Sequence, residues 1–181
     1  VMSILTEAIF WKILDDSGSI NETRGMKQIV FRSSKASLST FSKMHSYGEY
    51  IFDWAWAQSY EKQGVPYYPK LTSMVPFTPA TVRHFQGDQS HWRELLGMHD
   101  ECLKNHSSAH FLFTTPEEQI FLGEHGYILR DSFQYHFINQ GYQNFESFLQ
   151  SLKVKKAKQI RRERIHSNIK IERITNTDLH S

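Results

Sequence analysis

The chain has 181 residues, of which 39% are hydrophobic and 14% aromatic, so it carries enough apolar side chains to bury a full core. The formal net charge of +2 is too small to favour nucleic acid or a membrane surface as a partner. The single cysteine, Cys102, excludes an internal disulfide, and no apolar run approaches the roughly 18 residues that a membrane span requires. The N-terminal residues lack the basic start and apolar core of an export signal. We therefore expect a cytoplasmic, globular protein.

The first half of the chain predicts two helices, a hairpin and a strand. Apolar side chains recur at helical spacing in two segments, each followed by a glycine that can end a helix. Two runs of β-forming residues between them predict a hairpin. Prolines end the strand that follows, because proline cannot donate to a β-ladder. The expected boundaries are 6–16 and 52–63 for the helices, 28–32 and 37–46 for the hairpin, and 70–75 for the strand.

The second half alternates helices and strands. Its clearest boundary is Thr115-Pro-Glu-Glu118, because a threonine cap, a proline at the first helical position and a glutamate at the third form a capping box. That helix is expected to end near His125. The other expected elements are a helix over 89–105, strands over 109–113 and 127–138, a helix from Phe145 that continues into a basic segment, and a strand over 169–174. This alternation predicts an α/β or α+β domain around a mixed sheet.

The segment 47–79 is the main candidate for a functional site, because aromatic side chains, two carboxylates and one lysine between prolines are typical of a binding cleft. Glu49 and Asp53 lie four residues apart, so an early helix start would place both on one face, where they can orient an amine or act as a general base. In the alternative interpretation, Asp53 caps the helix and the neighbouring tryptophans fill the core. Lys70 either binds an anionic group or extends its ammonium group to solvent.

Histidines suggest two further sites. His99, Cys102 and His106 lie on one predicted helical face and can ligate zinc, but no CxxC or HExxH pattern supports them, so we expect no metal. Cys102 has no predicted base and is not expected to be a nucleophile. Gln134 and His136 would point the same way from the predicted strand, and His136 can shuttle protons near neutral pH. The alternative is a histidine that is satisfied by hydrogen bonds on a half-buried strand.

The segment from Lys153 to Arg164 is the main charge cluster of the chain. Its basic side chains would suit phosphate contacts with an RNA or a nucleotide-linked donor, although a solvated helix face is the commoner explanation of such a run. No Walker loop or Rossmann fingerprint is present, which argues against nucleotide hydrolysis.

Several ordered blocks resemble the FemAB-like predicted N-acyltransferases, described as peptidoglycan biosynthesis or recognition proteins. The blocks are 47–57, 67–71, 75–79, Gln134-Tyr-His136, Gly141-Tyr142 and 160–164. The resemblance spans nearly the whole chain but about the N-terminal half of a family member, which has two GNAT-like lobes. It implies that residues 1–181 form a single GNAT-like lobe, a mixed sheet flanked by helices, which pairs with a second lobe of a longer protein or with another copy of the chain.

The resemblance also implies the chemistry: transfer of an acyl or aminoacyl group to an amine, with a cell-wall peptide precursor as acceptor. The donor substrate would be acyl-CoA or aminoacyl-tRNA, with no tightly bound cofactor. The Gln/Arg-x-x-Gly-x-Gly/Ala loop that holds acetyl-CoA in GNAT enzymes is missing, and residues 80–87 depart from the Val-Thr-Gly-x-Arg pattern of the family.

We assign candidate residues to this transfer reaction in three groups. The catalytic candidates are Asp53, Glu49 and His136, and the substrate-binding candidates are Trp54, Trp56, Tyr67, Tyr68, Lys70, Thr78 and Gln134. The donor-binding candidates are Lys155, Lys158, Arg161 and Arg162. The alternative function is a recognition module that binds a peptidoglycan peptide or sugar in the same aromatic cleft without turnover.

Overall fold

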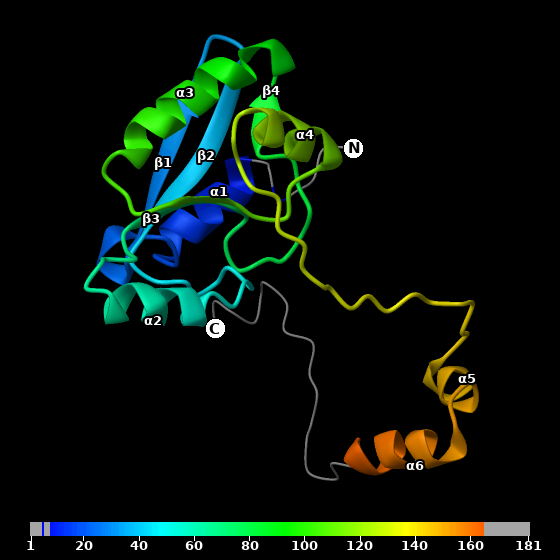
Figure 1. The fold of residues 1–181 in the computed structure, drawn as a ribbon. Coiled ribbons are helices and arrows are strands. Elements are labelled where there is room, and N and C mark those ends of the chain that lie inside the picture. Colours follow the sequence, from blue (N-terminus) through cyan, green and yellow to red (C-terminus); the bar gives the residue numbers. More distant parts are fainter. Residues whose placement is uncertain (1–4, 6–7, 165–181) are drawn as a thin grey trace, which may run out of the picture. The chain divides into compact units, whose positions relative to one another are not determined.

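The computed structural model describes residue 5 and residues 8–164, and the chain divides into two compact units, residues 1–130 and residues 131–181. The first unit is an α+β arrangement around a mixed sheet, which confirms the predicted fold class (Figure 1). The single lobe expected over residues 1–181 stays a prediction. The helices are α1 (Ala8–Asp16), α2 (Trp54–Lys62), α3 (Trp92–Leu103), α4 (Pro116–Glu124), α5 (Phe145–Gln150) and α6 (Val154–Glu163). The strands are β1 (Met26–Arg32), β2 (Ala36–Lys43), β3 (Lys70–Ser73), β4 (Phe85–Gly87) and β5 (Ala109–Phe111).

Strand β2 organises the sheet of the first unit. It forms the predicted antiparallel hairpin with β1, from Met26 opposite Lys43 to Arg32 opposite Ser37. Its other edge pairs antiparallel with β4 near the start of the strand and with β3 near its end. Strand β5 pairs with β3 in parallel, which makes the sheet mixed. The sequence did not predict β4, a strand of three residues that is defined by its pairing with β2.

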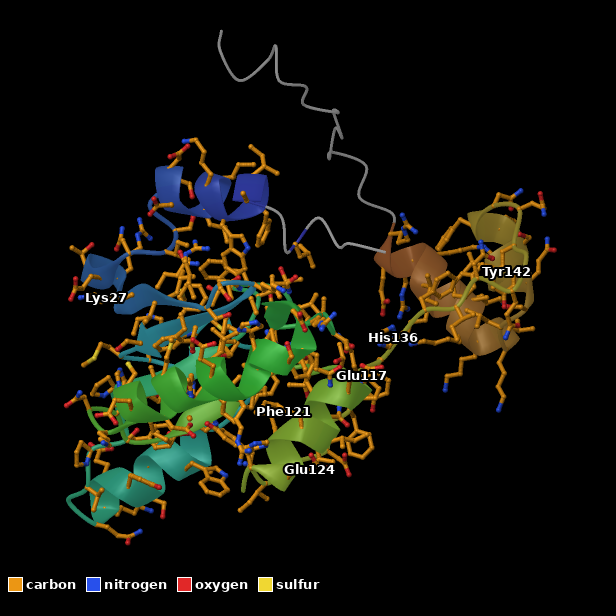
Figure 2. The ribbon with its side chains drawn as sticks, turned by 90° about the horizontal axis from the view of Figure 1, so that it is seen from above. Lys27, Glu117, Phe121, Glu124, His136 and Tyr142 are labelled. Carbon is orange, nitrogen blue, oxygen red and sulfur yellow. The ribbon has the colours of Figure 1, made fainter. Side chains whose placement is uncertain are left out.

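The two faces of the sheet are covered by different helices, and Figure 2 shows α1 and α3 on opposite sides. Side chains alternate along β2, so Leu38 points to one face and Phe41 to the other. Leu38 belongs to a core cluster with the buried side chains of α3, among them Trp92 and Leu95. Phe41 belongs to a second cluster against which Trp11 of α1 packs. Both helices therefore stabilise the sheet by burying apolar surface.

Helix α4 begins as the capping box predicts. The Thr115 hydroxyl accepts from the Glu118 amide, and Glu118 Oε2 accepts from the Thr115 amide at 3.0 Å. The other oxygen of Glu118 accepts the amides of His84 at 2.5 Å and Phe85 at 2.9 Å. One fully buried carboxylate thus fixes the start of α4 and the start of β4 together.

The chain from residue 127 onward differs from the sequence-based expectation. The predicted strand over 127–138 is wrong, because the structure assigns no helix or strand to these residues. Apolar and polar side chains alternate there as in a strand, but a strand also needs a neighbour that satisfies its backbone, and no described residue pairs with this segment. The single helix expected from Phe145 is two helices, since the extended backbone of Lys153 separates α5 from α6. The strand predicted over 169–174 lies outside the described residues.

Candidate functional site

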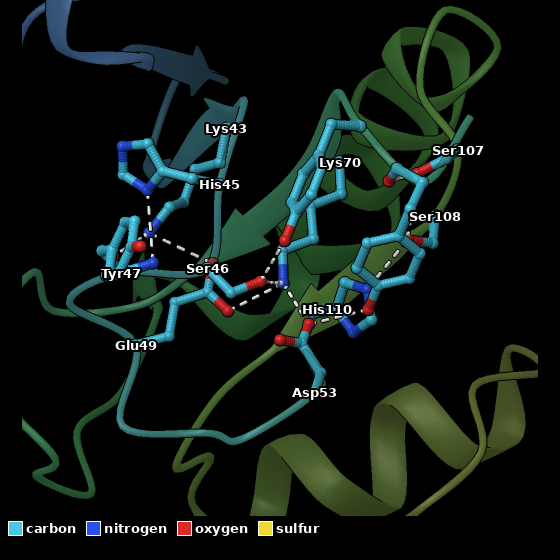
Figure 3. A network of polar contacts seen from close by, with 12 residues as sticks. Lys43, His45, Ser46, Tyr47, Glu49, Asp53, Lys70, Ser107, Ser108 and His110 are labelled. Carbon is cyan, nitrogen blue, oxygen red and sulfur yellow. Dashed lines mark hydrogen bonds and ion pairs between the residues drawn. The ribbon is translucent and has the colours of Figure 1, made fainter. Parts of the chain in front are cut away.

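A buried lysine lies at the centre of the candidate site. The side chain of Lys70 is 1% exposed, and its ammonium group donates to three side chains (Figure 3). The acceptors are Ser46 Oγ at 2.9 Å, Glu49 Oε2 at 2.8 Å and Asp53 Oδ2 at 2.5 Å. Two of the predicted catalytic residues, Glu49 and Asp53, therefore meet at the predicted substrate-binding residue Lys70. Lys70 does not extend its ammonium group to solvent.

The sheet and one loop bring these residues together. Lys70 opens β3 directly opposite Lys43, the last residue of β2, so the strand pairing places two lysines side by side. The chain after β2 then turns back over them. Gly48 has φ +77°, a left-handed conformation that favours glycine, and a Cβ there would lie 2.7 Å from the Phe77 ring. Tyr50 is also left-handed, with φ +56°. This turn, rather than the spacing of a helix, directs Glu49 and Asp53 to Lys70, because α2 begins after Asp53.

Glu49 bridges the two lysines. Its Oε1 lies 3.1 Å from Lys43 Nζ, an ion pair without hydrogen-bond alignment, while Lys43 Nζ donates to the Tyr47 carbonyl at 2.6 Å. Burial lowers the pKa of Lys43, and the charge of Glu49 opposes that shift. Two lysines and two carboxylates balance in charge, as buried ionic groups generally require. Both oxygens of Glu49 face lysines, so this carboxylate is poorly placed to receive a substrate.

Asp53 has one fixed oxygen and one free oxygen. Its Oδ2 accepts from Lys70 and from the Tyr67 hydroxyl, the latter at 2.7 Å. Burial raises the pKa of Asp53, but hydrogen bonds from Lys70 and Tyr67 outweigh it and hold the pKa below its usual value. Oδ1 is buried and has no hydrogen-bond partner among the described residues. Asp53 stands at the N-cap position of α2 without making a side-chain capping bond, which argues against a purely capping role.

An open hollow of about 590 Å³ is linked to Asp53 through Tyr67, which lines the hollow and donates its hydroxyl to the carboxylate, although Asp53 itself is not a lining residue. The residues that line it come from α2 and the loop after it: Trp54, Ala57, Gln58, Glu61, Gly64, Val65, Pro66, Tyr67 and Tyr68. Three of these are predicted substrate-binding aromatics. The hollow carries one carboxylate, Glu61, and no basic side chain, so its lining suits a neutral or cationic ligand.

The two tryptophans of this region are partly exposed, whereas Tyr67 is buried. Trp54 is 41% exposed and Trp56 is 50% exposed, so the interpretation that these tryptophans fill the core is wrong. The Trp54 ring lies 5.3 Å from the Tyr47 ring, and the guanidinium of Arg130 lies 4.8 Å from the centre of the Trp56 ring. Tyr67 is buried, and its ring packs edge to face on Tyr68 at 5.0 Å. Thr78 lies in a separate turn, where its hydroxyl donates to the Pro76 carbonyl.

The sequence did not identify three residues of the polar network. Ser46 accepts from Lys70 and hydrogen-bonds the Tyr68 hydroxyl at 2.9 Å. Lys43 follows from the register of β2 and β3, which sequence alone does not fix. His110 of β5 hydrogen-bonds Ser108 through Nε2 at 2.8 Å, and burial, with the charge of Lys70, lowers its pKa to about 4. His110 is therefore neutral at pH 7.

The remaining candidates lie in the second unit. Gln134 and His136 are exposed, and their side chains hydrogen-bond each other at 2.9 Å, although they do not lie on a strand. The donor-binding candidates Lys155, Lys158, Arg161 and Arg162 lie on α6, where Arg161 pairs with Glu146 of α5. Their roles stay predictions.

The histidines and the cysteine considered as zinc ligands lie in different surroundings in the structure. His99 is buried in the core of α3, and burial lowers its pKa. His106 lies beyond the end of α3 and bonds the Cys102 carbonyl and the Ser42 hydroxyl, each at 2.9 Å. Burial raises the pKa of the Cys102 thiol, which disfavours the nucleophilic thiolate. No three His, Cys, Asp or Glu side chains within the described residues are placed to hold a metal ion.

Comparison with known proteins identifies the family to which the chain is similar. A FemAB-like family model, described as peptidoglycan biosynthesis/recognition, matches residues 2–181. No curated protein and no solved structure matches the chain. Among the described residues, none of the helices has the length and apolar character needed to span a membrane.

Proposed function

We propose that the chain takes part in transferring an acyl or aminoacyl group to an amine of a peptidoglycan precursor. The proposal starts from the family, because the chain belongs to the FemAB-like family of peptidoglycan biosynthesis and recognition. The hollow beside α2 would bind the acceptor, and Asp53 would receive its amine. The observation that carries this proposal is the position of Asp53, whose Oδ1 has no hydrogen-bond partner among the described residues: Asp53 precedes Trp54 in the chain and accepts from Tyr67, and both of these residues line the aromatic hollow.

The surroundings of Asp53 suit the binding of an amine. A buried carboxylate oxygen without a partner is costly, and an ammonium or amine donor would offset that cost. Lys70 and Tyr67 hold the other oxygen and fix the direction of the carboxylate before substrate arrives. Pre-organised groups of this kind raise affinity because less order has to be imposed on binding.

The lowered pKa of Asp53 supports a positioning role in preference to proton removal. A general base works best when its pKa lies near the working pH, and hydrogen bonds hold this carboxylate in its charged form. In this proposal Asp53 anchors the amine by charge and direction. His136 remains the candidate for proton transfer, and α6 the candidate for contact with a phosphate-bearing donor, acyl-CoA or aminoacyl-tRNA.

Substitution of Asp53 by asparagine in the full-length protein tests the proposal. A charge-assisted hydrogen bond contributes about 1.5–3 kcal/mol, so Asp53→Asn should weaken acceptor binding or kcat/KM by about tenfold or more. The assay measures transfer from acyl-CoA or aminoacyl-tRNA to a muropeptide with a free amine, and near-UV circular dichroism checks the fold. Asp15→Asn, an exposed position on α1, is the matched control. Unchanged binding and transfer in a folded Asp53→Asn variant would exclude the assigned role.

Recognition without turnover is the second candidate function. It is favoured because most of the carboxylate oxygens in the buried network already pair with lysines. Both oxygens of Glu49 and one of Asp53 are occupied by lysines, and His110 is held neutral. Such groups are well fixed for binding and poorly suited to moving protons. Tight muropeptide binding, lost in Asp53→Asn, without transfer from any of the donors tested would establish this function in place of catalysis.

A further inference from the structure

A second hollow, of about 360 Å³, lies in the first unit on the sheet face covered by α1. Strands β1 and β2 form one wall, and α1 and the segment from Val75 to Gln86 form the others. Its lining side chains are Ala8, Trp11, Gln28, Val30, Arg32, Ser37, Ser39, Val75, Val82, Arg83, His84 and Gln86. The β2 positions Ser37, Ser39, Phe41 and Lys43 share this face, so the second hollow and the buried lysines lie toward opposite ends of one strand.

The charge of this second hollow is entirely positive. Arg32 and Arg83 both line it, and none of its lining residues is acidic. Neither arginine forms an ion pair with a described residue, although Glu117 lies near enough for Arg83 to contribute slightly to the lowered pKa of that carboxyl group. Arg83 donates to the Gly87 carbonyl at 3.3 Å, and its guanidinium lies 4.9 Å from the centre of the Trp92 ring. These contacts position Arg83 without forming an ion pair among the described residues.

Uncharged donors accompany the two arginines. The Gln28 amide donates to Ser39 Oγ at 2.8 Å, so the hydroxyl hydrogen of Ser39 remains available. Ser37 lies directly opposite Arg32 in the register of the hairpin. Trp11, Val75 and Val82 supply an apolar wall beside these polar groups. Small-molecule sites generally combine such an apolar wall with a few convergent polar groups in a volume of about 300–1,000 Å³.

We infer that this second hollow binds a small anion, a carboxylate or phosphate attached to an apolar group, between Arg32 and Arg83. Arginine suits planar and tetrahedral oxyanions because its guanidinium presents several N–H donors in a fixed geometry. The apolar portion of the ligand would lie on Trp11. This site is separate from the hollow beside Asp53 and does not depend on the transfer reaction proposed above.

Titration of the full-length protein with three probes tests the inference. Inorganic phosphate and benzoate represent the two anions, and benzylamine has the shape of benzoate with the opposite charge. Isothermal titration calorimetry should give saturable binding of at least one anion and none of benzylamine. Because each arginine would donate a charge-assisted hydrogen bond to the anion, Arg32→Gln and Arg83→Gln should each weaken that binding by about tenfold or more. Arg93→Gln, at an exposed position of α3 outside the hollow, is the matched control.

Each outcome decides the inference. Binding of phosphate alone assigns a phosphate ligand, and binding of benzoate alone assigns a carboxylate with an apolar group. Arg83 contacts Trp92, so its loss can disturb the core, whereas Arg32 is exposed at the end of β1 and tests the charge alone. The inference is overturned if neither anion saturates, if benzylamine binds as well as benzoate, or if Arg93→Gln weakens binding as much as Arg32→Gln.

Discussion

Glu49 is the residue on which the charge balance of the buried network depends, because its two oxygens face two different lysines. Asp53 has a smaller structural role, since Lys70 retains Glu49 and Ser46 as acceptors when the Asp53 charge is removed. The two carboxylates, equivalent in the sequence pattern, therefore have different roles in the structure. Glu49 compensates both buried lysines, and Asp53 is the carboxylate that the proposed function assigns to the ligand.

A substitution at Glu49 should separate these roles. Glu49→Gln leaves Lys43 without its carboxylate in a fully buried position, and breaking a buried ion pair costs about 3–5 kcal/mol. We expect the free energy of unfolding, measured by urea titration at pH 7, to fall by about 3 kcal/mol. Asp53→Asn should reduce it less.

Glu61→Gln, an exposed change on α2, controls for the loss of a negative charge and should shift the free energy of unfolding by less than about 0.5 kcal/mol. Equal stability of Glu49→Gln and the parent protein would contradict the assigned role of Glu49.

At the scale of elements, the sequence predicted correctly those helices and strands that depend on interactions between residues close together in the chain. Thr115 and Glu118 form the predicted capping box, and the hairpin of β1 and β2 follows its β-rich runs. Long-range contacts account for the failures. Strand β4 exists through its pairing with β2, and residues 127–138 carry a strand pattern without a described partner. The buried polar network follows the same division. The sequence pattern singled out Asp53, Tyr67 and Lys70, whereas Lys43 joins the network through strand register and Ser46 through the chain reversal after β2.

Glu118 links helix α4 to strand β4 and offers a test of that coupling. Both oxygens of Glu118 accept hydrogen bonds from backbone amides. In Glu118→Gln, one of these oxygens becomes an NH₂ group, which cannot accept from the amides that face it. Each buried group that loses its partner costs about 1–3 kcal/mol. We expect the free energy of unfolding to fall by about 2 kcal/mol or more, measured by urea titration.

The adjacent Glu117→Gln is the matched control, because Glu117 is exposed one position earlier in the same helical turn. If Glu117→Gln destabilises the protein as much as Glu118→Gln, the effect belongs to the charge of the helix N-terminus and not to the link with β4.

At the scale of the whole molecule, charged side chains and regular secondary structure are both distributed unevenly. In the first unit, one hollow carries a carboxylate and a buried aspartate oxygen beside it, and the other carries two arginines without acidic neighbours in its lining. The small net charge of +2 therefore does not reveal that one hollow is lined by an acidic side chain and the other by basic side chains. In the second unit, aromatic side chains gather where the structure assigns no helix or strand. Phe133 is 94% exposed and Tyr135 is 100% exposed.

Limited digestion with chymotrypsin should distinguish exposure from order. Cleavage needs several residues of backbone to open locally, so an exposed aromatic side chain is cut quickly where few contacts hold the chain. Phe52 is 85% exposed but adjoins Asp53, which Lys70 and Tyr67 hold. We expect the first cuts, identified by mass spectrometry, after Phe133, Tyr135 or Phe137, before any cut after Phe52. Replacing these three residues by serine should slow the first cut, whereas Phe52→Ser should not. If the first cut instead falls after Phe52, the buried network does not fix the loop that carries Phe52 and Asp53.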